Sequence, residues 1–214
     1  MLHLTSHTMD LRLFCNRTMC VVGPSHSGKT TFVLKLLEYK NSAFKCEMQR
    51  IVWCYGIYQH ELNTELQTRG YETHAGILPV EKIQPYDIIV LDDLIQESKN
   101  SQDVTSMFTR AAHHKPCFII FITQNLFPPG KEARTRNLNT HYYVLFKNPR
   151  DKSQFEAIAR QIRARNVKPL TDIFEAATEK PFSYLFLDLT QECPDAFRFR
   201  SNLFDRPMII YKPL

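Results

Sequence analysis

One stretch of eight residues decides the fold of this chain: Gly23-Pro24-Ser25-His26-Ser27-Gly28-Lys29-Thr30. The stretch has the form G-x-x-x-x-G-K-T. An apolar run over residues 19–22 precedes it, and a predicted helix over residues 30–38 follows it. It therefore lies between a predicted strand and a predicted helix. This context indicates a phosphate-binding loop instead of a glycine-rich turn that binds nothing.

Two glycines give the loop its expected shape. Gly23 and Gly28 let the backbone bend tightly and approach a phosphate with no Cβ in the way. The N–H groups between them then point inward, at the positive end of the following helix. We expect Lys29 to reach the β- and γ-phosphates of ATP, Thr30 to bind Mg²⁺, and Thr31 to donate to the α-phosphate. The predicted nucleotide-binding set is Gly23, Pro24, Ser25, His26, Ser27, Gly28, Lys29, Thr30 and Thr31.

A strand with an acidic end supplies the second part of the predicted site. Its sequence is Tyr86-Asp87-Ile88-Ile89-Val90-Leu91-Asp92-Asp93. Ligands of open α/β sheets bind outside the carboxyl ends of such strands. We expect Asp92 to hold Mg²⁺ through water, and Asp93 to orient and polarise the water that attacks ATP. The alternative is that one of the two acids caps the N-terminus of a helix.

A polar amide follows the next predicted core strand. Residues 117–122 form a continuous apolar run that leads directly into Thr123-Gln124-Asn125. At the tip of a strand beside the acidic one, the Gln124 amide can touch the γ-phosphate or the attacking water. We therefore predict that Gln124 is a sensor of the γ-phosphate. The alternative is an ordinary turn residue.

Strands and helices alternate along the chain. Predicted strands cover residues 18–22, 50–55, 87–91, 117–122, 142–146 and 184–189. Predicted helices cover residues 30–38, 61–68, 103–113, 152–165 and 171–178. This alternation predicts an α/β fold with a mostly parallel central sheet and helices on both faces, and the phosphate-binding loop makes it one of the P-loop NTPase type. We expect a single domain over residues 1–214, with an N-terminal extension (1–17), a core (about 18–190) and a C-terminal tail (191–214).

Composition is ordinary for a globular protein. Hydrophobic residues make up 43% and charged residues 23% of the chain, and no apolar run approaches the roughly 18 residues that cross a bilayer. The first residues lack the basic and apolar regions of a signal peptide. The six cysteines lack metal-type spacing, so we expect them to be reduced and buried, in a cytosolic or nuclear protein. His113-His114 also lacks a metal-type partner and is expected to end a helix.

The net charge of +5 is unevenly distributed. Residues 131–168 contain ten Lys or Arg and three acids, a local charge of +7, whereas the rest of the chain carries −2. A basic block on a nearly neutral protein points to a polyanionic partner. The alternative is a solvated face without a partner.

Taken together, the loop, the acid pair and Thr123-Gln124-Asn125 are similar to the FtsK–HerA superfamily of P-loop motors. More closely, the chain resembles the genome-packaging ATPases of double-stranded DNA viruses, the poxvirus-type enzymes and their relatives in polinton-like viruses, adintoviruses and virophages. The resemblance covers roughly residues 18–205. Five further stretches carry it: Trp53-Cys54-Tyr55-Gly56, Met107-Phe108-Thr109-Arg110, Gln124-Asn125-Leu126-Phe127, Leu145-Phe146-Lys147-Asn148-Pro149-Arg150-Asp151 and Pro181-Phe182-Ser183-Tyr184-Leu185-Phe186-Leu187-Asp188-Leu189.

Two positions depart from this resemblance. Ala111-Ala112 stands where the related sequences have a glycine, and a helix tolerates alanine better than glycine. His26 stands in a part of the loop where small residues are usual. Its backbone N–H can still donate to a phosphate, and we expect its side chain to face solvent.

The resemblance implies a RecA/FtsK-like fold and an ATPase that drives double-stranded DNA into a preformed capsid. It implies a homo-oligomeric ring (pentamer or hexamer), capsid proteins as partners, and no membrane partner. The expected location is the host cytoplasm or nucleus at sites of virion assembly, or the virion itself. Each active site would be completed by an arginine of the neighbouring subunit. Arg134 and Arg136 are favoured for this role and Arg110 is a third candidate, while contact with DNA phosphates is the competing role.

Three other functions stay open on the sequence alone. A P-loop kinase for a small molecule would use residues 131–136 as a lid over its acceptor. A replicative or repair helicase would come from the same motor superfamily. A nucleotide-gated capsid assembly protein would depend on ATP binding more than on turnover. Turnover with and without duplex DNA, and a strand-displacement assay, separate these functions from packaging.

Overall fold

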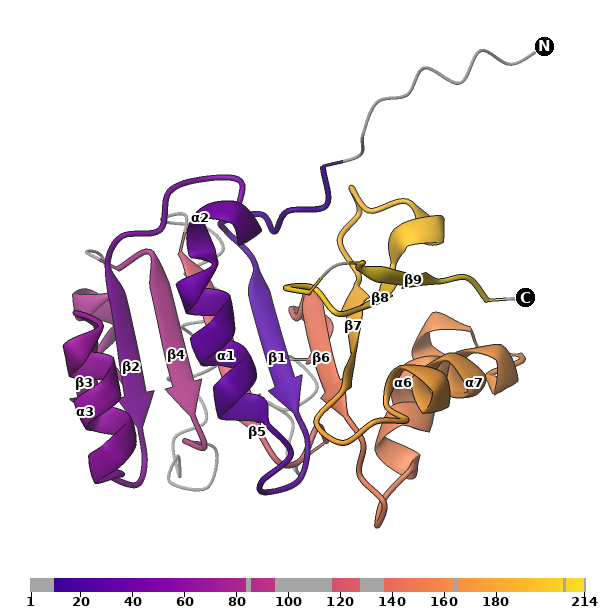
Figure 1. Cartoon of the computed structure of the whole chain (residues 1–214), viewed down its shortest axis with the longest axis horizontal. Coiled ribbons are helices and arrows are strands. Elements are labelled where there is room, and N and C mark those ends of the chain that lie inside the picture. Colours follow the sequence, from indigo (N-terminus) through magenta and orange to yellow (C-terminus); the bar gives the residue numbers. More distant parts are fainter. Residues whose placement is uncertain are drawn as a thin grey trace.

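Figure 1 shows a central sheet with helices packed against it, in a computed structural model that describes residues 10–83, 86–94, 117–127, 137–163, 165–205 and 207–213. Within these residues a nine-stranded sheet has the order β3-β2-β4-β5-β1-β6-β7-β8-β9. The strands are β1 (Thr18–Val22), β2 (Ile51–Tyr55), β3 (Glu72–Ala75), β4 (Ile88–Asp92), β5 (Phe118–Thr123), β6 (Tyr142–Phe146), β7 (Tyr184–Asp188), β8 (Phe199–Ser201) and β9 (Ile209–Tyr211). The helices are α1 (Lys29–Glu38), α2 (Lys40–Ala43), α3 (His60–Thr68), α6 (Ser153–Ile162) and α7 (Lys168–Ala177), with two 3-10 helices, η1 (Val80–Lys82) and η2 (Asp195–Phe197).

The strand that leads into the loop, β1, lies in the middle of the sheet. It pairs in parallel with β5 on one side and with β6 on the other, and β4, β2 and β3 continue the parallel part. The strands β4 and β5 are nearly continuous apolar runs because both faces of a central parallel strand are covered. Beyond β6, the strands β7, β8 and β9 add in antiparallel orientation. The predicted mostly parallel sheet is therefore confirmed.

Helices cover both faces of this sheet, as predicted. Successive side chains of a strand point to opposite faces, so Val21 belongs to one core cluster and Val22 to the other. The helix α1 packs on the first face through Phe32, Val33, Leu36 and Leu37. The helices α6 and α7 pack on the second face through Phe155, Ile158, Ala159, Leu170, Ile173 and Ala177. No helix in the described ranges is both long enough and apolar enough to cross a bilayer.

The sequence-predicted elements are found close to their expected bounds. All six predicted strands are present, and four of the five predicted helices correspond to α1, α3, α6 and α7. The fifth predicted helix, over residues 103–113, and the His113-His114 pair lie outside the described residues. The strands β3, β8 and β9 and the short helix α2 were not predicted. Two of these strands, β8 and β9, lie in the segment expected to be a C-terminal tail, and they extend the sheet.

Cys15 and Cys46 correct the expectation that all six cysteines are reduced and buried. They form a disulfide with their Cα atoms 6.2 Å apart, and Cys15 is half-buried while Cys46 is exposed. Leu13 N donates to Ala43 O at 2.7 Å, and Lys45 N donates to Leu13 O at 2.9 Å. This short pairing brings the two cysteines together, although 31 positions separate them in sequence. The other four are buried and form no disulfide, as predicted: Cys20, Cys54, Cys117 and Cys193.

Candidate active site

The carboxyl ends of β1, β4 and β5 meet at one edge of the sheet, the lower edge in Figure 1. The loop between β1 and α1 lies at this edge, and a cleft of about 980 Å³ opens beside it. The lining of the cleft includes loop residues, the acid pair at the end of β4, and aromatic side chains from later segments. Parallel strands thus bring together residues that are far apart in the sequence.

The geometry of the loop requires both of its glycines. A Cβ on Gly23 would lie 2.6 Å from Ser27 Oγ and 2.7 Å from Phe146 Cβ, closer than side-chain atoms tolerate. Gly28 has a φ of 102°, in the left-handed region that glycine adopts without the energetic cost that other residues incur. His26 also has a positive φ, 61°, and is exposed, so it bends the loop while its side chain faces solvent.

Lys29 begins α1, and its ammonium group folds back into the loop. Its Nζ donates to the carbonyl oxygens of Gly23 and Pro24, both at 2.8 Å. An ammonium group has three N–H donors, so one remains for a phosphate oxygen. Burial lowers the pKa of Lys29, and the nearby Asp93 and Asp92 carboxylates oppose this shift. The ammonium group is thus fixed in the loop, next to the acid pair.

One buried hydroxyl of the loop fits a phosphate oxygen. Ser27 Oγ is buried and makes no hydrogen bond within the described residues. A buried polar atom without a partner costs free energy, and a phosphate at a helix N-terminus would satisfy it. Thr30 and Thr31, in the first turn of α1, line the same cleft. The loop therefore suits a phosphate chain.

Thr30 and Asp92, the predicted Mg²⁺ ligands, both line the cleft. In the part of the chain that the structure describes, no group of three or more His, Cys, Asp or Glu side chains could hold a metal by itself. Mg²⁺ is usually bound by one or two protein oxygens together with phosphate oxygens and water. An open pair of oxygen ligands beside a phosphate loop has the right chemistry for this ion.

Asp92 accepts a hydrogen bond from a tryptophan that the sequence motifs did not assign to the site. Trp53 Nε1, on the neighbouring strand β2, donates to Asp92 Oδ2 at 3.3 Å. Burial raises the pKa of Asp92 to about 6, with repulsion from Asp93 adding to the shift, while the Trp53 hydrogen bond and the charge of Lys29 oppose it. Trp53 is the only tryptophan of the chain, and its presence in the quoted stretch over residues 53–56 was the available signal.

Asp93 turns sharply away from the strand. Its φ is 53°, and its N–H donates to Ile122 O at 3.2 Å. Gln124 Nε2 donates to Asp93 Oδ2 at 3.0 Å, and Ser25 Oγ donates to Gln124 Oε1 at 3.3 Å. These hydrogen bonds connect the phosphate loop, the predicted sensor and the predicted base in one chain of contacts.

The three candidate arginine fingers, Arg110, Arg134 and Arg136, lie outside the described residues. The described residues that line the cleft include lysine and histidine but no arginine.

The cleft is also lined by residues to which the motifs gave no role. They are Phe182, Tyr184, Phe204 and Asp205, together with Lys35 of α1. Phe182 lies in the turn before β7, and Phe204 lies in the segment after β8. These residues are far from the loop in sequence, and the sheet order brings them to it.

In sequence, the chain matches no family model and no curated protein. In structure, it is similar to the genome packaging NTPase B204 from Sulfolobus turreted icosahedral virus 2, which was solved in complex with ATP-gammaS. That chain is 13% identical, with a TM-score of 0.55 over 94% of this chain and 98% of that chain. The present chain is also similar in structure to the KaiC-like protein PH0186 from Pyrococcus horikoshii OT3. The two are 11% identical, with a TM-score of 0.45 over 92% of this chain and 90% of that chain. The first likeness shows the fold, and the chain has the P-loop NTPase architecture that its loop predicts.

Proposed function

We propose that this chain is an ATPase that drives double-stranded DNA into a viral capsid. One observation carries the enzymatic part. The loop with Lys29, the acids Asp92 and Asp93, and Gln124 converge at one sheet edge, where hydrogen bonds link the loop to Gln124 and Gln124 to Asp93. A P-loop that only binds nucleotide does not need an amide-supported carboxylate beside its lysine. The resemblance to packaging ATPases and the fold shared with a genome packaging NTPase support the choice of DNA as the cargo.

Different side chains of the cleft would bind the phosphates, bind Mg²⁺ and position the attacking water. The loop N–H groups, Ser27 Oγ and the remaining N–H donor of Lys29 hold the phosphate oxygens of ATP. Thr30 and Asp92 would hold Mg²⁺, which neutralises charge on the β- and γ-phosphates when it is bound. Gln124 engages Asp93 Oδ2, which leaves Oδ1 to accept a hydrogen bond from the attacking water.

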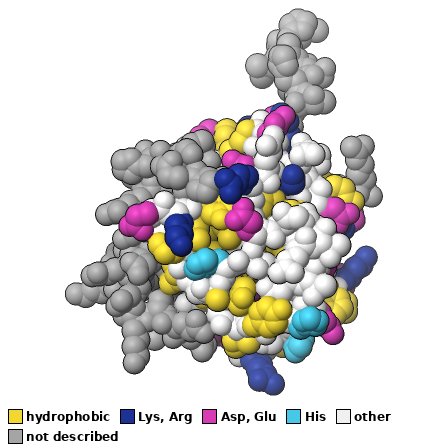
Figure 2. Space-filling view, turned by 90° about the vertical axis from the view of Figure 1, so that its left-hand side faces the viewer, with side chains coloured by type: hydrophobic (Ala, Val, Ile, Leu, Met, Phe, Trp, Pro, Cys, Tyr) yellow, Lys and Arg dark blue, Asp and Glu magenta, His cyan; other side chains and the backbone are white. Residues whose placement is uncertain are grey.

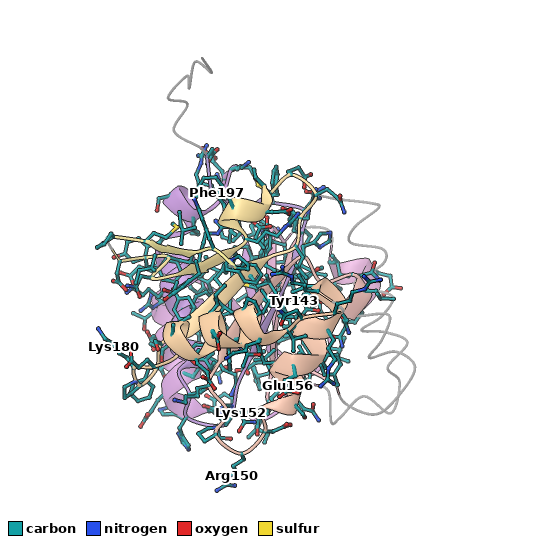
Figure 3. The ribbon with its side chains drawn as sticks, turned by 90° about the vertical axis from the view of Figure 1, so that its right-hand side faces the viewer. Tyr143, Arg150, Lys152, Glu156, Lys180 and Phe197 are labelled. Atoms are coloured by element: carbon teal, nitrogen blue, oxygen red, sulfur yellow. A yellow bond between two sulfur atoms is a disulfide. The ribbon has the colours of Figure 1, made fainter. Side chains whose placement is uncertain are left out.

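Exposed basic residues without an ion-pair partner support a DNA partner. Lys147, Arg150, Arg163 and Arg165 are all exposed, and none of them has an ion-pair partner within the described residues. In Figure 3, Arg150 projects from the lower edge, the edge at which the cleft opens. By contrast, Figure 2 shows acidic and basic side chains interspersed on the side that carries α3 and β3, where Arg69 pairs with Glu65. Phosphate contacts need cations that are not already neutralised.

The cleft also supports a ring. Its described lining contains no arginine, and a homo-oligomer of five or six subunits would place an arginine of one subunit, Arg134 in the first instance, at the cleft of the next. A ring can also encircle a duplex, which one 214-residue chain cannot. We place such a ring on capsid proteins at the site of virion assembly, in the cytoplasm or nucleus of the host.

Turnover with and without duplex DNA tests this function. We expect duplex DNA to raise ATP hydrolysis by the wild type, and we expect the increase to fall steeply with salt because phosphate contacts release counterions. Lys29→Ala should have no turnover under either condition, which controls for a contaminating ATPase. Turnover that is independent of DNA at low salt would contradict the proposal and favour a small-molecule kinase or an assembly protein. ATP-dependent separation of the two strands of a duplex would instead favour a helicase.

A further inference from the structure

The lining of the cleft includes one exposed aromatic residue to which the proposed hydrolysis gives no role. Phe182 is 71% exposed and lines the cleft. A Cβ on Gly28 would lie 3.7 Å from Phe182 Cβ and Cδ1, so the aromatic residue stands beside the last glycine of the loop. It is therefore close to the start of α1.

The sheet order places the acid pair and Phe182 on opposite sides of the loop. Asp92 ends β4 and Asp93 follows it, two strands from β1 on one side. Phe182 precedes β7, two strands from β1 on the other side. If the acids support hydrolysis as proposed, the terminal phosphate of a bound nucleotide would face them. Its nucleoside would then leave the loop toward β7, on the side where Phe182 lies.

The backbone of Phe182 is held in an unfavourable conformation. Its φ is 63°, in the left-handed region, where a bulky aromatic residue is an outlier. The turn around it is fixed, because Ser183 N and Ser183 Oγ both donate to Lys180 O, at 3.2 and 2.6 Å. Packing does not explain a strained backbone that presents an apolar ring to water, whereas a ligand that covers the ring does.

Three other aromatic residues that line the cleft pack against one another. Phe32 of α1 packs edge-on against Tyr184 with ring centroids 4.8 Å apart, and Phe204 lies 5.3 Å from Phe32. Tyr184 Oη accepts a hydrogen bond from Leu203 N at 3.1 Å, which ties the segment after β8 to β7. These rings contact one another, while the ring of Phe182 is largely exposed.

We propose that Phe182 is the stacking platform for the nucleobase of the bound nucleotide. The proposal rests on the proposed function in one respect, namely that the phosphates lie in the loop. Stacking uses the π-face that every nucleobase has, so the platform serves adenine and guanine alike. Base selectivity then has to come from elsewhere, and Phe182 supplies affinity.

Calorimetric titration of the full chain with two ligands tests the platform. Mg-ATPγS contains a base, whereas Mg-tripolyphosphate offers the loop the same kind of phosphate chain without one. We expect Phe182→Ala to weaken the binding of ATPγS about tenfold, which is in the lower part of the range for loss of one stacked base. The affinity for tripolyphosphate should stay the same. Phe182→Trp should restore ATPγS binding, and a GTP analogue should lose affinity in the same proportion as ATPγS.

A matched control is Leu138→Ala, which removes another exposed apolar side chain, 74% exposed and outside the cleft. It should change neither affinity. Unchanged ATPγS affinity in Phe182→Ala would overturn the platform. An equal loss of affinity for ATPγS and for tripolyphosphate would also overturn it, because Phe182 would then support the phosphate-binding loop and not the base.

Failure of the platform and failure of the proposed function give different results. If Phe182→Ala weakens only the base-containing ligands while the wild type has no DNA-stimulated turnover, the platform stands and the motor function is wrong. If turnover is stimulated by DNA but Phe182→Ala binds ATPγS like the wild type, the platform is wrong and the motor function stands. A wild type that binds neither ligand contradicts both.

Discussion

At the scale of single residues, we propose that hydrolysis depends most on Asp93. Its side chain is exposed in the cleft, and the Gln124 amide holds one of its two carboxylate oxygens. Its φ of 53° turns the carboxylate out of the strand and toward the loop. Aspartate and asparagine adopt this left-handed conformation more readily than most residues, so the turn does not exclude an amide at this position.

Asp93→Asn separates nucleotide binding from turnover. We expect this variant to bind ATPγS like the wild type and to lose about 10²–10⁴-fold in ATP turnover, the range for loss of a general base. The measurement is turnover beside ATPγS affinity, with Asp172→Asn on the exposed side of α7 as the control. Wild-type turnover in Asp93→Asn would exclude Asp93 as the base.

The pKa of Asp92 predicts how turnover depends on pH. Burial raises it to about 6, and the ionised form is the one that binds Mg²⁺, so turnover at limiting Mg²⁺ should fall as the pH drops through about 6. Trp53→Phe keeps an aromatic ring but removes the N–H that stabilises the carboxylate, so the pKa of Asp92 should rise further and the midpoint should move to higher pH. The test compares the two pH profiles, with urea unfolding to check that the variant is folded. Identical midpoints would show that Trp53 does not position Asp92.

Local patterns made some site residues predictable and left others hidden. Gly28 and Lys29 could be predicted because a loop that binds phosphate needs glycine and a cation at fixed spacing before a helix. Trp53 and Phe182 lie in stretches that carry the resemblance, but their positions beside the loop and the acid pair could not be predicted, because these depend on the strand order. The hydrogen bond of Trp53, for example, requires β2 to lie next to β4.

At the scale of elements, a buried ion pair joins β7 to β8. Arg200 of β8 is 1% exposed and donates through Nη2 to Asp188 Oδ2 of β7. Its Nη1 donates to Leu11 O at 3.1 Å, so the same side chain ties residues before β1 to this end of the sheet. Asp188 also accepts from Thr190 N and Thr190 Oγ1, at 3.0 and 2.6 Å.

Removal of the arginine should destabilise the fold strongly. Arg200→Ala leaves the Asp188 carboxylate buried without its counter-charge, and we expect a loss of about 3–5 kcal/mol in the free energy of unfolding. The control is Arg160→Ala, which breaks the exposed pair of Arg160 with Glu156 on α6 and should cost about 0.3–0.5 kcal/mol. Urea unfolding measures both. Similar losses in the two variants would contradict the structural role of Arg200.

The strands that the sequence did not predict lie at or next to the two edges of the sheet. The central strands β4 and β5 are buried on both faces, so they appear in the sequence as apolar runs. The strand β3 is Glu72-Thr73-His74-Ala75, partly exposed along its length, and it has no such run. The strands β8 and β9 have three residues each, too few for a pattern to develop. Their positions depend on pairing with β7, which a local pattern does not report.

At the scale of the whole molecule, the proposed ring requires subunits that complete one another's active sites. Arg134→Ala subunits keep an intact Asp93, and Asp93→Asn subunits keep an intact Arg134. A ring that mixes them therefore contains interfaces at which both residues are intact. We expect the mixture to recover part of the turnover that each variant lacks alone, as an arginine finger acting from a neighbour requires.

The control for this experiment mixes Asp93→Asn with Lys29→Ala. Both residues belong to the same subunit's cleft, so this mixture should stay inactive at every ratio. If Arg134→Ala with Asp93→Asn also stays inactive at every ratio, Arg134 does not act across an interface.

Movement along intact duplex DNA tests the motor itself most directly. A third strand bound to one end of a duplex is displaced when a translocase runs into it, without separation of the duplex strands. We predict that the wild type displaces this third strand with ATP, that it does not do so with ATPγS, and that Asp93→Asn does not do so with either nucleotide. The contradicting result is ATP hydrolysis that duplex DNA stimulates while the third strand stays bound. The proposed motor function would then be wrong, because the energy of ATP would not be used to move DNA.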